Sequence, residues 1–280
     1  MWAEDCRMAQ PIIDAWIQHP TGAFLRHEMF ASLRRWMKLD VVPNEIPVEL
    51  TLASLDRAGV TKALTSAWWG PQGPLLANDD VARIVQAHPD RLAGIGSVDL
   101  HRPMDAVREL RRCVKELGFV GVRLLPWLWG LPPNDRRYYP IYAECVELDV
   151  PFCLQVGHAG PLRPSEPGRP IPYLDEVACE LPELRIVGGH IGYPWTEEMV
   201  SLATKYENVY IDTSAYTPER YPEALLRFMK GPGQRKVLFG SNYPMIQPAK
   251  CIQQLDALGL SEETQHLFLY ENAARVFGLA

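Results

Sequence analysis

The amino-acid sequence predicts one domain of the α/β class, a (β/α)8 or TIM barrel that spans residues 1–280. Eight short apolar, β-branched runs are each followed by a segment of helical periodicity, which is typical of βα units with a parallel sheet. The length of 280 residues fits a barrel, since such folds run to about 250 residues as one unit. No long Pro/Ser/Gly linker divides the chain, so we expect a single closed barrel rather than two domains.

The eight predicted strands lie at residues 12–18, 60–68, 92–98, 120–126, 151–158, 184–190, 209–214 and 236–242. The segments between them have amphipathic patterns. In MDAVRELRRCVKELG, residues 104–118, Val107, Leu110 and Val114 fall on one helical face, and Gly118 stands where a helix would end. This alternation of strand and helix patterns fixes the expected order of the elements.

The longest predicted connection follows the first strand and runs from residue 19 to about residue 47. Within it, FLRHEMFASLRRWM, residues 24–37, is predicted to form one amphipathic helix that carries Phe30, Leu33 and Trp36. A βα loop of this length is usually a lid or wall over the site of a barrel. We therefore expect a lid.

Composition excludes several classes of partner. Lys and Arg number 28 and Asp and Glu number 34, a net charge of −6, so no basic surface for nucleic acid or anionic lipid is expected. No apolar run is long enough to span a bilayer and the first residues do not resemble a signal peptide, so a cytoplasmic protein is predicted. The six cysteines are far apart without a C-x-x-C pair, and we expect reduced thiols.

The carboxyl ends of the predicted strands carry the candidate catalytic residues, because βα loops build the sites of barrels. His158 and His190 end the fifth and sixth strands, each beside glycine. Arg123 lies on the fourth strand and Asn242 ends the eighth. Two histidines at adjacent strand ends favour a functional role over a structural one.

Six motifs then resemble a known family. They are VGVRLLP, QVGHAG, GGHIGYPW, VYIDTSAY, VLFGSNYP and the closing ENAARVFGL. Together they resemble amidohydrolase family 2 of the amidohydrolase superfamily, whose relatives include aminocarboxymuconate-semialdehyde decarboxylase, aromatic-acid decarboxylases and lactonases. The resemblance covers nearly the whole chain, implies a barrel, and suggests a homodimer because family members often dimerise.

The sequence departs from the family pattern at two strands. The first strand of the family reads D-x-H-x-H, whereas here Asp14 is followed by Trp16 and Gln18. The eighth reads G-S-D-Y-P, whereas here Asn242 replaces the metal-binding Asp. Of the usual metal ligands only His158 and His190 remain.

These replacements disfavour the usual zinc site. Two imidazoles and the amides of Gln18 and Asn242 would give a divalent ion no anionic ligand. A rebuilt site for iron, zinc or manganese that uses His158 and His190 stays open, provided that other side chains reach it. The candidates for that role are Asp14, His19, Glu28, Glu197 and Glu198. No nucleotide cofactor is expected.

Each candidate catalytic residue has a predicted role. His158 and His190 are candidate bases, because imidazole exchanges protons near neutral pH. Arg123 either binds a carboxylate or oxyanion or forms an internal salt bridge with Asp99 or Asp212. Asn242 could donate a hydrogen bond to a developing oxyanion.

Aromatic residues crowd the predicted strand ends, which suits an apolar or aryl acyl group. Part of this set is expected only to pack the loops together. The predicted substrate-binding residues are Trp16, Gln18, His19, Trp69, Trp127, Tyr193 and Tyr243. The expected partner is a small molecule, with no nucleic acid and no membrane.

The predicted function is hydrolysis of an ester, thioester, lactone or amide of an apolar or aromatic carboxylic acid, with water activated by His190 or by a metal held by both histidines. The first alternative is a decarboxylase or hydratase of an aromatic or unsaturated acid. The second is a catalytically silent barrel that binds a small apolar ligand.

Overall fold

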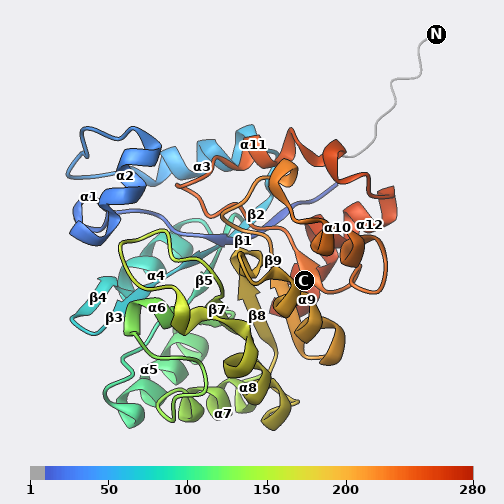
Figure 1. The fold of residues 1–280 in the computed structure, drawn as a ribbon. Coiled ribbons are helices and arrows are strands. Elements are labelled where there is room, and N and C mark those ends of the chain that lie inside the picture. The colour runs from blue at the N-terminus through green and yellow to red at the C-terminus, as the bar shows by residue number, and fades with distance from the viewer. Residues whose placement is uncertain (1–9, 280) are drawn as a thin grey trace.

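A computed structural model describes residues 10–279, which form a closed barrel of parallel strands surrounded by helices (Figure 1). The eight barrel strands are β1 (Ile13–Ile17), β2 (Lys62–Ser66), β5 (Leu92–Ile95), β6 (Val122–Leu124), β7 (Phe152–Gln155), β8 (Ile186–Gly189), β9 (Val209–Asp212) and β10 (Val237–Leu238). Each lies inside one of the eight predicted ranges. The prediction of a (β/α)8 barrel is confirmed.

The strands pair in chain order around the barrel. One parallel sheet joins β1, β2 and β5, and a second runs from β6 to β10. Parallel bridges from Gly96 to Val122 and from Ile17 to Tyr243 join the two sheets. The barrel is therefore closed, and all strand ends that carry candidate residues meet at one mouth.

Helices cover the outside of the barrel. They are α1 (Gly22–Arg26), α2 (Ala31–Met37), α3 (Val48–Arg57), α4 (Asn78–Ala87), α5 (Pro103–Lys115), α6 (Pro126–Trp129), α7 (Tyr139–Glu147), α8 (Asp175–Glu180), α9 (Thr196–Lys205), α10 (Glu223–Lys230), α11 (Pro248–Ile252), α12 (Glu262–His266) and α13 (Asn272–Phe277). In α5, Val107 and Leu110 of the predicted face are buried against the sheet, and Val114 is half-buried; Cys113, which the pattern did not place on that face, is buried as well. Two layers of apolar contacts result, one inside the barrel and one beneath the helices.

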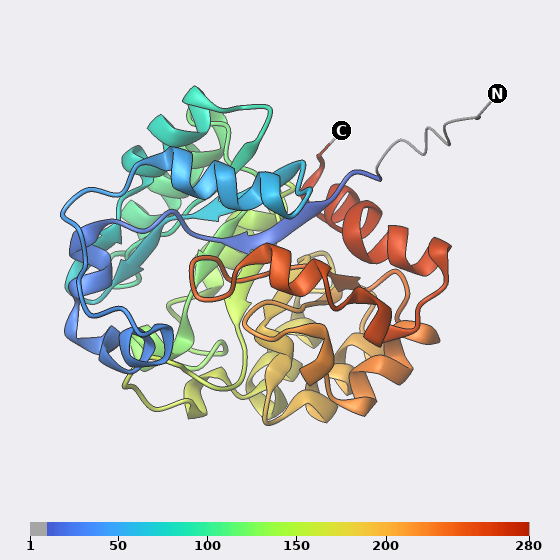
Figure 2. The same ribbon diagram turned by 90° about the horizontal axis from the view of Figure 1, so that it is seen from above.

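The lid differs from the single helix that the sequence predicts. Figure 2 shows it at the end of β1 that lies away from the N-terminus. It consists of α1, a 3-10 helix (Glu28–Phe30) and α2. His27 has an extended backbone, and its ring nitrogen Nδ1 accepts a hydrogen bond from the Met29 amide. The helix breaks there because this side chain caps the next turn instead of continuing the first.

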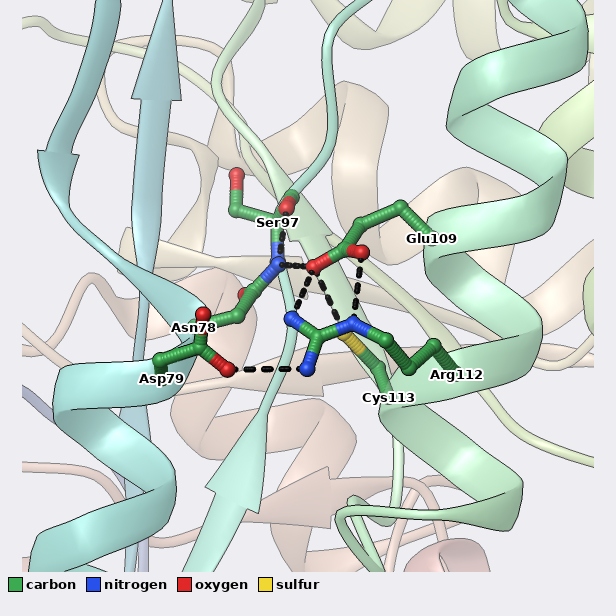
Figure 3. A network of polar contacts seen from close by, with 6 residues as sticks. All are labelled: Asn78, Asp79, Ser97, Glu109, Arg112 and Cys113. Carbon is green, nitrogen blue, oxygen red and sulfur yellow. Dashed lines mark hydrogen bonds and ion pairs between the residues drawn. The ribbon is translucent and has the colours of Figure 1, made fainter.

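A hairpin of β3 (Trp68–Gly70) and β4 (Gly73–Leu76) follows β2 and was not predicted. The Trp69 amide donates to Ser97 Oγ, and Ser97 in turn exchanges two hydrogen bonds with the Asn78 side chain. Asn78 also contacts Glu109, which pairs with Arg112 of α5 (Figure 3). This network fixes the hairpin against α4 and α5 and so positions Trp68 at the mouth.

Five cysteines of the described residues are free thiols, as expected, and Cys6 lies outside the described residues. Within residues 10–279 no helix is both long enough and apolar enough to cross a membrane.

Candidate functional site

A cavity of about 590 Å³ opens at the carboxyl ends of the strands, between the barrel and the lid. Five predicted site residues line it, namely Gln18, Trp127, His158, His190 and Asn242. They follow β1, β6, β7, β8 and β10, so closure of the barrel brings together residues that are far apart in sequence. This is the end of the barrel at which sites are expected.

Unusual backbone conformations concentrate at this cavity. His190, Ala215 and Asn242 line it and have φ values of 69°, 68° and 65°. Residues other than glycine seldom adopt such angles, and where they do the strain is commonly stored at functional sites. The strained backbone at His190 and Asn242 therefore favours a functional role for both side chains.

His190 is a buried, neutral imidazole. Its Nδ1 lies 2.6 Å from Ser214 Oγ. Burial, with smaller contributions from the Arg123 and His158 charges, lowers the pKa of His190 to about 3. His190 therefore serves as a hydrogen-bonding group at neutral pH rather than as a cation.

His158 is exposed to the cavity, and its backbone is held on both sides. Its amide donates to the Tyr193 carbonyl at 2.6 Å, and its own carbonyl accepts from Gln155 Nε2 at 2.7 Å. The same Gln155 side chain accepts from the Trp127 indole at 2.7 Å. Of the two cavity imidazoles, His158 is the one in contact with solvent.

The two amides that replace family ligands bind each other. Gln18 Nε2 donates to Asn242 Oδ1 at 3.3 Å and to the Tyr243 carbonyl at 2.7 Å. Gln18 Oε1 is buried and has no hydrogen-bond partner among the described residues. The pair closes one side of the cavity floor with neutral polar groups.

Trp16 and Arg123 lie beneath the cavity rather than in its lining. The Arg123 guanidinium stacks on the Trp16 ring at 3.5 Å, and that ring lies 5.1 Å from the His190 ring. A Cβ at Gly189 would come within 2.4 Å of the indole, so only glycine leaves room for it. Trp16 therefore lies on the barrel axis directly beneath His190. Because Trp16 and Arg123 are packed under the cavity, neither side chain is placed to contact a substrate directly.

Arg123 forms neither of the predicted salt bridges. It donates weakly to the carbonyls of Ala15 and Ile17, at 3.3 and 3.5 Å. Burial lowers its pKa to about 10, against the opposing attraction of Cys153, Asp212 and Asp14. The guanidinium is a buried cation that supports the floor of the site.

Two buried carboxyls lie in the same layer. Asp14 Oδ1 accepts from the amides of Ser241 and Trp16, and Asp212 Oδ1 accepts from the Ser214 amide. Burial raises the pKa of Asp14 to about 7 and that of Asp212 to about 6. Their second oxygens have no partner among the described residues.

Four other predicted substrate-binding residues are absent from the cavity lining. His19 bonds Thr51 Oγ1 and the Ile46 carbonyl through its two ring nitrogens, at 2.9 and 3.1 Å. Tyr243 is buried, and the Tyr193 ring packs against the Tyr216 ring in a tilted arrangement at 5.7 Å. Trp69 is replaced in the lining by its neighbour Trp68, because successive side chains of a strand point to opposite faces.

The sequence analysis missed much of the cavity wall. Apart from Trp68, the residues that line it include Phe24, Phe30, Leu33, Arg34, Trp36, Tyr216, Arg220 and Lys250. Phe30, Leu33 and Trp36 belong to the lid that the sequence predicts over the site, but the sequence analysis did not assign them to substrate binding. Arg220 and Lys250 had no periodic signal.

A family model of the amidohydrolase 2 group, with the description Amidohydrolase, matches residues 43–279. The chain belongs to this amidohydrolase family. The match covers most of the chain and starts after β1, the strand on which Trp16 and Gln18 depart from the family pattern.

The chain is similar in sequence to two enzymes of known activity. A 2-keto-4-carboxy-3-hexenedioate hydratase of Sphingobium sp. is 29% identical over 245 residues, which cover 71% of this chain and 70% of the hydratase. A gamma-resorcylate decarboxylase of Rhodococcus jostii is 29% identical over 263 residues, which cover 72% of this chain and 75% of the decarboxylase. These relatives support the decarboxylase or hydratase alternative; the ester or amide hydrolase that the sequence analysis put first has no support from them.

Solved structures confirm the fold of the amidohydrolase chain. The crystal structure of an uncharacterized TIM-barrel protein from Bordetella bronchiseptica superimposes with a TM-score of 0.81 at 23% identity, over 96% of this chain and 98% of that one. A dihydroxybenzoic acid decarboxylase from Polaromonas sp., solved with bound manganese and 2-nitroresorcinol, has a TM-score of 0.72 at 19% identity, over 96% and 97% of the two chains.

The manganese of that decarboxylase raises the question whether this amidohydrolase could hold a divalent ion. Within residues 10–279 no group of three or more His, Cys, Asp or Glu side chains is placed to bind one. Asp14 is buried in the barrel and Glu198 pairs with Arg169, while Glu28 and Glu197 do not line the cavity. The described residues do not fit a resident divalent ion, because His158 and His190 share the cavity lining with no Asp, Glu or Cys side chain.

Proposed function

We propose that this protein is a lyase that acts on a small aromatic or unsaturated carboxylic acid, with loss of the carboxyl group as its reaction. The observation that carries the proposal is the character of the cavity wall. Two imidazoles and the aromatic rings of Trp68 and Trp127 line it, and among the described residues no Asp or Glu side chain does so. Such a wall suits a flat anion, since no like charge opposes it.

The aromatic side chains bind and orient the ring of the acid. Trp68 and Trp127 pack edge to face at 5.9 Å, and Phe30 lies against Trp68 at 5.9 Å. Rigid aromatic walls restrict a flat ligand to few orientations and exclude water from its faces. The carboxylate is then held toward the polar floor.

His158 supplies the proton in the proposed step. In its protonated form it gives the proton to the ring carbon that bears the carboxylate. The bond from this carbon to the carboxylate then breaks, its electron pair returns to the ring, and CO2 leaves. The imidazole regains its proton from water, so protons and electrons balance. No step passes through a metal.

His190 and Asn242 have supporting roles in this proposal. The neutral His190 ring, fixed by Ser214, offers a hydrogen bond to a polar ring substituent. Asn242 offers an amide N–H to the negative charge that develops on the substrate. The Asp of the family pattern could not donate such a hydrogen bond when ionised. Both act by position rather than by proton transfer.

The test is a product assay by mass spectrometry. Purified protein is incubated with hydroxybenzoates, with unsaturated carboxylic acids and with aryl esters. Loss of CO2 from an acid is the expected result, and addition of water would instead assign a hydratase. Cleavage of the esters, with the acids unchanged, would contradict the proposal.

A histidine variant tests the assigned proton donor. We expect His158→Asn to lower kcat about 10²- to 10⁴-fold, the usual contribution of general acid catalysis. His101→Asn is the matched control, because His101 is exposed and outside the cavity wall. Full activity of the His158 variant would contradict the assignment.

A further inference from the structure

Three cationic side chains line the same cavity. Arg34 belongs to α2 of the lid, Arg220 to a 3-10 helix (Pro218–Arg220) after β9, and Lys250 to α11 after β10. In the closed barrel β9, β10 and β1 are neighbours. Arg220 and Lys250 therefore enter from adjacent βα segments, whereas α2, which carries Arg34, contacts the loop after β7 through Ser32 and Gly160. We call these three lining cations the cationic rim of the mouth.

No described residue neutralises this rim. None of Arg34, Arg220 and Lys250 forms an ion pair within residues 10–279, in contrast to the arginines of α5, which pair with Glu144, Asp79 and Glu109. Among residues 10–279 no Asp or Glu lines the cavity, although the chain as a whole has a net charge of −6. A cationic opening in an acidic protein attracts and concentrates anions.

Arg34 is held in place by the lid itself. Its Nη1 donates to the Leu25 carbonyl at 2.6 Å and to the His27 carbonyl at 2.9 Å. These bonds use one nitrogen of the guanidinium, so the other N–H groups stay available for a ligand. A preoriented arginine suits the two oxygens of a carboxylate or phosphate.

Arg220 and Lys250 enter the cavity from strand ends other than that of the proposed proton donor. His158 follows β7, whereas Arg220 and Lys250 follow β9 and β10. A single carboxylate that reacts beside His158 could pair with one cation and would leave the others without an anionic partner.

We infer that the substrate carries two anionic groups: the reacting carboxylate beside His158 and a second carboxylate or phosphate bound by Arg34, Arg220 and Lys250. The inference rests on the proposed function in that the reacting acid occupies this cavity. It narrows the substrate class to aromatic or unsaturated dianions. It also assigns the three cations as specificity residues.

Calorimetric binding of matched probes tests the inference. The probes are trans-cinnamate, 4-carboxycinnamate and 4-phosphooxycinnamate, together with biphenyl-4-carboxylate and biphenyl-4,4′-dicarboxylate as a longer pair. We expect the dianion of at least one pair to bind about 5- to 30-fold more tightly, the sum of two or three partly exposed ion pairs. The phosphate probe shows whether a carboxylate or a phosphate is preferred.

Variants then show which residues cause the preference for dianions. The double variant Arg220→Gln/Lys250→Gln is expected to reduce it to about twofold or less, since two of the three ion pairs are lost. Lys115→Gln is the control, because it removes one positive charge from an exposed position on α5 far from the mouth. Higher salt should weaken the preference of the wild type in the same way as the variants do.

Equal affinity for mono- and dianions in both pairs would overturn the inference and leave the proposed function intact. A preference that survives in the variant that also carries Arg34→Gln would overturn it as well. Failure of every probe to bind would overturn both proposals. Preferential binding of dianions without turnover of any acid would support the rim and contradict the proposed chemistry.

Discussion

Trp16 is the residue that most distinguishes this protein from the pattern of its family. In that pattern its position is a metal-ligating histidine, and here an indole packs between Arg123, Gly189 and His190. An indole has no lone pair to offer a metal, and its bulk fills the barrel axis. A substitution at one position thus changes both the donor set and the space beneath the cavity.

Metal content follows from this packing. We expect protein purified without a histidine tag to hold well under one divalent ion per chain, measured by plasma mass spectrometry, because the cavity offers no anionic ligand. The triple variant Trp16→His/Gln18→His/Asn242→Asp should gain manganese or zinc binding, measured by calorimetry. The single variant Gln18→His is the control and should not gain it. One tightly held ion per wild-type chain would refute this account.

Asp14 gives the stability of the protein a defined pH dependence. Its folded pKa is raised from 3.8 to about 7, mainly by burial. At pH values between these two pKa values the folded state keeps a proton that the unfolded state has lost. The Asp14 carboxyl therefore lowers the free energy of unfolding as pH rises from about 4 to 7. Asp212 likewise lowers the stability of the protein as pH rises to about 6, because its folded pKa is also raised. His190 has the opposite effect below the pKa of unfolded histidine, because its folded pKa is lowered.

The variant Asp14→Asn isolates this contribution, because an amide does not titrate. We expect the variant to exceed the wild type in free energy of unfolding by about 1–3 kcal/mol at pH 8, and the difference to vanish near pH 4. Urea denaturation at several pH values measures it. A difference that is independent of pH would show that the Asp14 carboxyl does not titrate between these values.

At the scale of elements, the lid is held by contacts that it makes with the loop after β7. Ser32 Oγ donates to the Gly160 carbonyl at 2.7 Å, and the Leu162 amide donates to the Met29 carbonyl at 3.0 Å. A Cβ at Gly160 would lie 2.8 Å from the Leu33 side chain. The lid therefore closes one wall of the cavity through few polar bonds and close apolar contact.

The variant Ser32→Ala should loosen the lid. Loss of one partly buried hydrogen bond is worth about 0.5–1.5 kcal/mol, so we expect amide hydrogen exchange in residues 22–37 to become about 2- to 10-fold faster. Exchange in the barrel strands should not change. Ser201→Ala on the exposed face of α9 is the control. Unchanged exchange in the lid would mean that apolar contacts alone hold it.

At the scale of the whole molecule, the pattern of strands predicted the barrel and the end of the barrel at which the cavity opens. All eight strands form within their predicted ranges, because each run is apolar over the length that a buried parallel strand needs. His158, His190, Asn242 and Gln18 line one cavity because strand ends of a closed barrel must meet. The order of strands and helices alone was sufficient to predict that these four side chains lie together.

The β3–β4 hairpin and the broken lid could not be predicted in the same way. Trp68 rather than Trp69 lines the cavity because of the face that the hairpin presents to it. The hydrogen bond from the Trp69 amide to Ser97 fixes this orientation. The break at His27 depends on one side-chain cap. Both features are set by single contacts that leave no periodic signal in a sequence.

The sequence by itself determined the barrel, its family and the polar residues at its strand ends, since these depend on local periodicity and on fixed motifs. Only the tertiary structure decided that Trp16 and Arg123 are buried under the cavity and that Arg34, Arg220 and Lys250 line the same cavity. The physical reason is that burial and charge proximity depend on packing between segments distant along the chain. No local pattern records which of those segments will touch.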